Sequence, residues 1–382
     1  MSKKGSIKFT LIRGIAALGI ALGVAYLLIL YSSSGATMGE RFSASFKALR
    51  EMLISPIFRK DGSFSLKGFS DVLAGMIPIL FTGLATCVMF AAKQFNLGAE
   101  GGVMLGAFIT ALVAIYARLP GPLLIIVAVL AGGACAGAVM LIPAVLKAKL
   151  GVSEMVNSLM LNYVIMYVIK YLMNTHLADT SKGITQTFPF QENAVIPQIV
   201  NNGSRLSWGF AVGIAVVILI WFFMYRTKWG YGIRMTGMNQ PFVMYSGMNV
   251  AMIIILSQVL GGFLAGMGGG IEMLGRYNVY NWSALPGYGW TGITVAILAG
   301  NNPLYVPLAA FFMSYLTKGC TLMSTNADIP SQLISIIQAL IFIFFAARQF
   351  LAGYRQKLVV QAAKEEAELK ARQEGERSAQ KS

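Results

Sequence analysis

The sequence is short of charge. Only 12% of its 382 residues are charged, whereas about a quarter of the residues in a typical soluble domain are charged. A soluble protein needs a polar surface to cover its core, and 56% of this chain is hydrophobic. The composition therefore excludes an ordinary soluble globular protein and favours an integral membrane protein.

The sequence is also short of residues that perform chemistry. Its single histidine, His176, cannot form a histidine-based metal cluster or catalytic pair. The three cysteines are odd in number and lie in apolar stretches, which argues against a disulfide framework or a metal site. No phosphate-binding G-x-x-x-x-G-K-[ST] loop, zinc-protease motif or nucleophile elbow occurs. We therefore predict no catalytic residue, no metal and no cofactor in this chain, so that energy for its function comes from a partner or a gradient.

Long apolar runs are what the sequence has in abundance. A helix needs about 20 apolar residues to cross the bilayer core, and these runs lack the alternation of barrel strands. We predict an all-α integral membrane fold of about ten transmembrane helices. The eighth and ninth runs are short and are separated by Asn301, Asn302 and Pro303, so that nine or eleven helices remain alternatives. The expected spans are 9–30, 70–92, 101–118, 122–146, 155–174, 207–225, 250–268, 288–300, 304–318 and 331–350.

Basic residues at the ends of these runs account for the net charge of +15. They predict a multi-pass protein with cytoplasmic N- and C-termini, and contact with membrane lipid. No basic stripe is interleaved with aromatic residues, so no nucleic-acid partner is expected. We predict three regions: an anchor helix with an external segment (1–69), a membrane core (70–350) and a charged cytoplasmic tail (351–382). Within the first region, residues 42–58 are expected to form an amphipathic helix on the membrane surface.

Glycine is frequent inside the predicted spans, above all at residues 98–106 and 261–270. Small residues allow helices to approach closely in lipid, so packing alone explains them. The alternative is that they break helices at corresponding places in an internal repeat, as in some transporters.

Few ionisable residues lie in the apolar runs. Glu100, Glu154, Lys170 and Glu272 are expected to anchor span ends, which counts against a proton-coupled carrier. Polar or aromatic groups near the spans are candidates to line a substrate pathway, although packing explains each of them equally well. These candidates are Asn96, Glu100, Asn157, Asn162, Gln258 and Trp290.

The loop at residues 226–249 is unusual because its apolar residues should face water. Asn239 is expected to cap a short helix, with Pro241 in its first turn and Gly247 at its end. Such a helix would expose Phe242 and Tyr245, which suggests that it docks into the groove of a partner. A helix lying on the membrane is the alternative.

Four stretches together resemble the permease subunits of ABC importers for simple sugars and nucleosides, within the group that includes ribose and branched-chain amino-acid permeases. Any one alone would be weak, but they occur in the family's order and span roughly residues 70–350. They are F-N-L-G-A-E-G at 95–101, S-E-M-V with L-M-L-N-Y at 153–163, G-Y-G-I-R at 230–234 with Gly237 and Asn239, and G-Y-G-W-T-G-I through N-P-L at 287–304.

The resemblance implies a type II importer permease fold in a bacterial plasma (inner) membrane. Its implied partners are a second homologous permease in a heterodimer, an extracytoplasmic substrate-binding protein, and ABC ATPase subunits, which would bind the ATP and Mg²⁺. The function expected is passage of nucleosides or simple sugars, without enzymatic activity in this chain. A gradient-driven carrier, an ion channel and a permease for another solute, such as branched-chain amino acids, are the alternatives. The residues implied to couple to the ATPase are Gly230, Gly232, Arg234, Gly237, Asn239, Pro241, Phe242, Tyr245 and Gly247.

Overall fold

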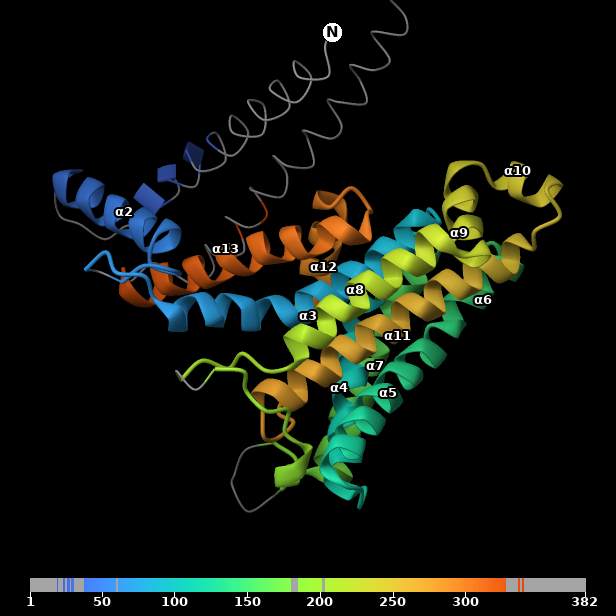
Figure 1. Ribbon diagram of the computed structural model, residues 1–382, viewed down its shortest axis with the longest axis horizontal. Coiled ribbons are helices and arrows are strands. Elements are labelled where there is room, and N and C mark those ends of the chain that lie inside the picture. The colour runs from blue at the N-terminus through green and yellow to red at the C-terminus, as the bar shows by residue number, and fades with distance from the viewer. Residues whose placement is uncertain are drawn as a thin grey trace, which may run out of the picture. The chain divides into compact units, whose positions relative to one another are not determined.

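A computed structural model describes residues 38–59, 61–179, 185–200 and 203–327, with a few isolated positions outside these ranges (Figure 1). The chain divides into two units, residues 50–327 and the two ends of the chain. The described residues form helices with two isolated β-bridges and no sheet, which confirms the all-α prediction. The α-helices are α2 (Met38–Leu53), α3 (Leu66–Ala91), α4 (Ala99–Tyr116), α5 (Gly121–Val139), α6 (Leu141–Leu150), α7 (Glu154–Leu172), α8 (Gly209–Arg226), α9 (Lys228–Met238), α10 (Gln240–Tyr245), α11 (Val250–Arg276), α12 (Tyr288–Leu298) and α13 (Val306–Asn326).

Seven of the described helical segments are long and apolar enough to cross a membrane. They correspond to seven of the eight spans predicted between residues 70 and 318. The eighth span, predicted at 288–300, is α12, whose 11 residues reach only about 16 Å at 1.5 Å per residue, roughly half of a bilayer core of ~30 Å. The first and tenth predicted spans and the charged tail lie largely outside the described residues, so the count of ten stays a prediction.

The helix α11 packs against α3, α4 and α5 and forms the centre of the larger unit. Its glycines make this possible: a Cβ on Gly106 of α4 would lie 2.2 Å from the carbonyl oxygen of Gly266, and a Cβ on Gly269 would lie 2.1 Å from that of Val103. The helix continues without interruption through residues 261–270. The helix break that was considered as the alternative does not occur at this place, and close packing, the first interpretation, explains these glycines.

The helix α13 lies along α3 (Figure 1). Ser314 donates a 2.6 Å hydrogen bond to the carbonyl oxygen of Val72, and Lys318 forms a 2.9 Å ion pair with Asp71. In the middle of α13, the Tyr315 hydroxyl donates to the carbonyl oxygen of Leu53. The first two contacts join α13 to α3, and the third attaches the last residue of α2 to α13. The helix α2 agrees with the amphipathic helix predicted at 42–58, although it begins earlier and ends sooner.

The two ends of α11 have different surroundings. The short helices α9 and α10 lie beside its first residues (Figure 1). At its other end, the irregular segment after α7 forms backbone hydrogen bonds to α11 and to the residues just beyond it: a bond of 3.0 Å joins the Ile196 N–H to the carbonyl oxygen of Leu274, and one of 2.9 Å joins the Phe190 N–H to that of Asn278. The helices α9 and α10 and the irregular segment after α7 are thereby separated by the length of α11. They could therefore meet partners on opposite sides of a membrane.

The glycine contact between α4 and α11 gives a direct test. We expect Gly106→Ala to destabilise the protein by roughly 1–3 kcal/mol, the usual cost of overpacking, because its Cβ would meet the backbone of Gly266. The measurement is the apparent melting temperature of the purified protein in detergent. Gly102→Ala is the matched control, since the nearest atom to its Cβ is a side-chain carbon 3.3 Å away. An equal loss in both variants would contradict this account of the packing.

Candidate functional site

The backbone leaves its helical path between α3 and α4, at residues 92–98, here called the connector. Three side chains of α7 accept hydrogen bonds from the connector and the first turn of α4. They are spaced four residues apart, so they lie on one face of α7. The bonds join the Phe95 N–H to Glu154 Oε1 (3.1 Å), the Leu97 N–H to Ser158 Oγ (2.9 Å) and the Gly101 N–H to Asn162 Oδ1 (2.9 Å).

A fourth polar side chain attaches the connector to α11. Asn96 donates a 2.7 Å hydrogen bond from Nδ2 to Gln258 Oε1, and its Oδ1 accepts one of 2.6 Å from the Gly98 N–H. Both amide side chains are fully buried. Because an unpaired polar group is costly in such surroundings, these bonds hold the connector in one conformation.

Glu100 caps the short helix α12. Its carboxylate accepts hydrogen bonds of 2.5 Å from the Gly287 N–H and 2.6 Å from the Gly289 N–H. A negative charge at a helix N-terminus is favoured by the helix dipole. Gly287 has a φ of +85°, and a Cβ on Gly289 would lie 2.4 Å from the Glu100 nitrogen, so the contact requires both glycines. On the other side, the Thr82 hydroxyl donates a 2.9 Å bond to the carbonyl oxygen of Tyr288.

The structure brings four of the six predicted pathway residues together around the connector: Asn96, Glu100, Asn162 and Gln258. Trp290 lies in the first turn of α12 and is 43% exposed. Asn157 lies on a different face of α7 from Asn162, and its Nδ2 has no hydrogen-bond partner among the described residues. The role of these residues in substrate passage stays a prediction.

Three carboxylates expected as surface anchors are buried instead. Glu100 caps α12, and Glu154 pairs with Lys147 at 2.8 Å. Glu272 pairs with Arg276 at 3.1 Å and accepts a bond from the Tyr288 hydroxyl. Glu100 and Glu154 do lie in the first turns of α4 and α7, as expected of span ends, but hydropathy could not show that they are buried, because it places a residue along a helix and not on one of its faces. Ser158 was missed, although its spacing of four from both Glu154 and Asn162 could have indicated it.

The helices α9 and α10 form the second feature of the site. A Cβ on Gly230 would lie 2.2 Å from the carbonyl oxygen of Phe223, and one on Gly237 would lie 2.0 Å from that of Ala91. Both glycines therefore allow α9 to rest directly on the backbone of α8 and of the last turn of α3. A Cβ on Gly232 would lie 2.9 Å from a side-chain carbon of Ile253. The contact with Ala91 places α9 immediately before the connector.

The remaining predicted coupling residues shape α9 and α10. Arg234 donates to the carbonyl oxygen of Met224 at 3.0 Å, with its guanidinium over the ring of Tyr225. The short helix predicted after Asn239 is confirmed: the Asn239 side chain accepts a 3.1 Å bond from the Phe242 N–H. Pro241 lies in the first turn of α10, and Gly247 follows its end with a φ of +77°.

The outer face of α10 is apolar and exposed. Tyr245 is 85% exposed and Phe242 is 50% exposed, and Met244 beside them is exposed as well. Exposed apolar surface of this kind is typical of a docking site. Within the larger unit, α10 is thus a short projection that contacts α9.

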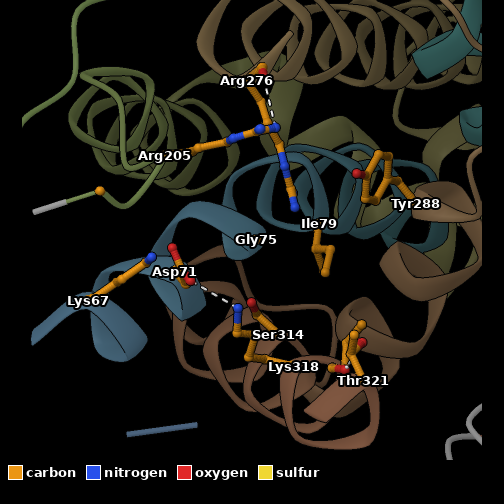
Figure 2. Close-up of a pocket in the computed structure, with 12 residues that line it drawn as sticks. Lys67, Asp71, Gly75, Ile79, Arg205, Arg276, Tyr288, Ser314, Lys318 and Thr321 are labelled. Carbon is orange, nitrogen blue, oxygen red and sulfur yellow. Dashed lines mark hydrogen bonds and ion pairs between the residues drawn. The ribbon is translucent and has the colours of Figure 1, made fainter. Parts of the chain in front are cut away.

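A polar cavity of about 460 Å³ lies near the opposite end of α11 (Figure 2). It is bounded by a stripe on α3 at residues 67, 71, 75 and 79 and a stripe on α13 at residues 314, 317, 318 and 321. These spacings place each set on one helix face. Gly203 and Arg205 of the preceding loop, Arg276 and Tyr288 complete the lining. Since Tyr288 begins α12, the cavity borders the helix that Glu100 caps.

Comparison with known proteins identifies the family. The model of one protein family matches residues 68–346, which is most of the chain. The family is described as the permease component of branched-chain amino acid transport systems. The chain belongs to this permease family. The match contains all four motifs on which the resemblance was based, and the resemblance is confirmed.

Curated relatives of this permease are named as ABC transporter subunits. It is 31% identical to a glucose ABC transporter permease protein of Haloferax volcanii, over 75% of this chain and 78% of the relative. It is 30% identical to a guanosine ABC transporter permease protein of Bacillus subtilis, over 75% and 84%. A nucleoside ABC transporter permease protein of Lactococcus lactis is 28% identical, over 74% and 80%. The permease is thus a multi-pass transport component and not an enzyme.

The cap of α12 can be tested by a single substitution. Glu100→Gln replaces one acceptor oxygen by an amide group that donates, so one N–H group of α12 loses its partner. We expect a loss of about 1–3 kcal/mol in stability, the cost of a buried unpaired group, measured as a lower melting temperature in detergent. Glu192→Gln, at an exposed position, is the control. Unchanged stability of Glu100→Gln would refute the capping role.

Proposed function

We propose that this permease forms the membrane pathway for nucleosides or simple sugars in an importer driven by a separate ATPase. The observation that carries the proposal is the set of relatives: those named for glucose, guanosine and nucleosides each align with about three quarters of the chain. The family description names branched-chain amino acids, which remain the second candidate cargo.

The proposal places α9, α10 and both chain termini in the cytoplasm of a bacterial cell. The exposed face of α10 would dock into a groove of the ATPase, which binds the ATP and Mg²⁺. The cavity near the opposite end of α11 would then face the extracytoplasmic substrate-binding protein. A second, homologous permease would complete the pathway as a heterodimer.

A continuous set of contacts supports this coupling role. A force on α10 reaches α9, whose Gly237 rests on the carbonyl of Ala91. The connector follows Ala91 directly, and Glu100, just beyond it, holds the N-terminus of α12. Movement of α9 would thus be transmitted to α12 and to the edge of the cavity. ATP binding in the partner would shift the equilibrium between two arrangements of these helices.

The rival functions lack such support. A proton-coupled carrier needs ionisable groups that can gain and lose protons along the pathway. Here Glu100 and Glu154 accept hydrogen bonds from backbone N–H groups, and Glu272 is paired with Arg276. These contacts use the carboxylates for structure. A gradient-driven carrier and an ion channel work without an ATPase. Neither function would therefore account for the exposed apolar face of α10.

Uptake measurements test the function directly. The chain is co-expressed with its genomic neighbours in cells that lack nucleoside uptake, and accumulation of labelled uridine and ribose is followed with and without ATP depletion. We expect accumulation that stops on ATP depletion, and the preferred label identifies the cargo class. Uptake that persists without ATP but stops with an ionophore would identify a gradient-driven carrier and overturn the proposal.

The docking role of α10 has its own test. Tyr245→Ala is expected to lower ATP-dependent uptake about tenfold or more, as loss of a central aromatic contact in an interface does, and to weaken co-purification of the ATPase. Tyr245 is almost fully exposed, so the melting temperature of the permease should not change. Tyr116→Ala, an exposed tyrosine at the end of α4, is the matched control. Gly237 is a poorer choice because any side chain there would push on Ala91. Normal uptake by Tyr245→Ala would exclude α10 as the docking element.

A further inference from the structure

The helix α7 has two faces of different character. The polar side chains that hold the connector lie on one face and are buried. On the side turned away from the connector, Tyr163, Tyr167 and Tyr171 are between 49% and 63% exposed. Their spacing of four residues places the three rings one above the other, about 6 Å apart along the helix. These three residues are called the tyrosine row.

The tyrosine row reaches the middle of the membrane. The helix α7 and the turn after it form a span over Glu154–Leu177, and Tyr163 and Tyr167 lie on either side of its midpoint. Tyrosines that face lipid gather near the interfaces, where the hydroxyl group meets water. Among the described residues, none of the three hydroxyl groups forms a hydrogen bond. An unpaired hydroxyl group in hydrocarbon is costly, so the row suits water or a polar solute better than lipid.

Two other spans show what a lipid-facing surface of this chain looks like. The helices α5 and α8 also have broad exposed faces, yet α5 contains no tyrosine and the single tyrosine of α8, Tyr225, lies in its last turn. Among these three helices, only α7 exposes tyrosine at its middle. The large exposed side chains inside the other two are hydrocarbons: Leu123, Ile126, Val127 and Leu130 on α5, and Val212, Ile218, Leu219 and Phe222 on α8.

Lys170 gives independent evidence that the tyrosine row meets water. It lies in the last turn of α7, from which a lysine surrounded by lipid extends its ammonium group outward to the interface. Here the ammonium group lies 5.9 Å from the centre of the Tyr167 ring, three residues nearer to the middle of the span. A charge turned toward the middle of a bilayer is costly unless water accompanies it.

The chemistry of the tyrosine row suits a flat, polar ligand. Nucleobases stack on aromatic side chains, and the contact tolerates any base because every base has a π-face. A free sugar has no such π-system. The tyrosine hydroxyl groups both donate and accept hydrogen bonds, as the polar edge of a base requires.

The helix α7 is also attached to the part of the chain that would transmit motion. Glu154 at its start accepts a hydrogen bond from the Phe95 N–H of the connector. The connector follows Ala91, whose carbonyl oxygen lies 2.0 Å from where a Cβ on Gly237 of α9 would be. A shift of α9 would therefore move α7 and the tyrosine row with it.

We propose that the tyrosine row lines an aqueous pathway and stacks on the base of a nucleoside as the nucleoside crosses the membrane. The inference rests on the proposed transport function and narrows its cargo to nucleosides in preference to simple sugars. The three rings provide successive positions for the base, one helix turn apart, from Tyr171 at the outer end to Tyr163 at the middle.

Thiol labelling in the complete transporter tests whether the row meets water. The permease is reconstituted in lipid with the partners encoded by its genomic neighbours, and ATP is supplied so that the pathway opens to each side in turn. Tyr163→Cys and Tyr167→Cys are treated with a positively charged thiosulfonate, and the unaltered chain with its own cysteines gives the background. We expect both to react at least about tenfold faster than Leu219→Cys on α8, because the reactive thiolate forms only in water. Uridine should slow this reaction and ribose should not.

Substitutions at Tyr167 test the stacking itself. Tyr167→Leu removes the ring and should raise the KM for uridine about tenfold, the usual size of one base–aromatic contact, with kcat and ribose uptake unchanged. Tyr167→Phe keeps the ring and should keep the KM within about threefold of the unaltered value. Phe222→Leu is the matched control, since it removes an exposed ring from α8, and it should leave the KM for uridine unchanged.

Three outcomes would overturn the inference. Labelling of both tyrosine positions no faster than that of Leu219→Cys would show that lipid or the second permease covers the row. Equal protection by uridine and ribose, or an unchanged KM for uridine in Tyr167→Leu, would show that the row does not recognise a base. ATP-driven uptake of uridine with an unreactive row would leave the proposed function standing. A reactive row that uridine protects, without ATP-driven uptake of any solute, would do the reverse.

Discussion

Backbone N–H groups that are buried outside a helix need partners, and this requirement governs the centre of the permease. The connector between α3 and α4 leaves several such groups without helical partners. In a membrane, each unpaired group costs several kcal/mol. Glu154, Ser158 and Asn162 from α7 each accept a hydrogen bond from one such group, and Asn96 Oδ1 accepts one from the Gly98 N–H. Polar side chains that would otherwise suggest a transport pathway are thus part of the frame that makes the connector possible.

The same principle explains α12. The first N–H groups of this 11-residue helix have no partner within the helix itself. The Glu100 carboxylate accepts two of them, and Gly289 allows it to approach. Because Glu100 lies in the first turn of α4, directly after the connector, the connector, α4 and α12 are mechanically joined. A motion that begins at α9 therefore has a route to the cavity bordered by Tyr288.

Glycine residues determine how closely the helix backbones approach one another. The contacts of Gly106 with Gly266 and of Gly269 with Val103 bring backbones together, so that dispersion forces and close packing stabilise the bundle where lipid offers no hydrophobic driving force. The connector interrupts this packing, and there Glu154, Ser158 and Asn162 of α7 accept hydrogen bonds from backbone N–H groups that the helices leave free.

The sequence by itself determined the class of protein, seven of its crossing helices, the cap of α10 by Asn239 and the family, because hydropathy, capping and motif order are local properties that need no neighbour. It could not determine which face of a helix a carboxylate occupies, so Glu100, Glu154 and Glu272 were expected at surfaces and are buried. It also suggested a break in α11 where the glycines serve packing. Only the tertiary structure decided these points, and only it brought residues 67–79, 203–205, 276 and 314–321 to one cavity, since their contacts join segments far apart in the sequence: Arg205 and Arg276 are separated by 71 residues, and Asp71 and Lys318 by 247.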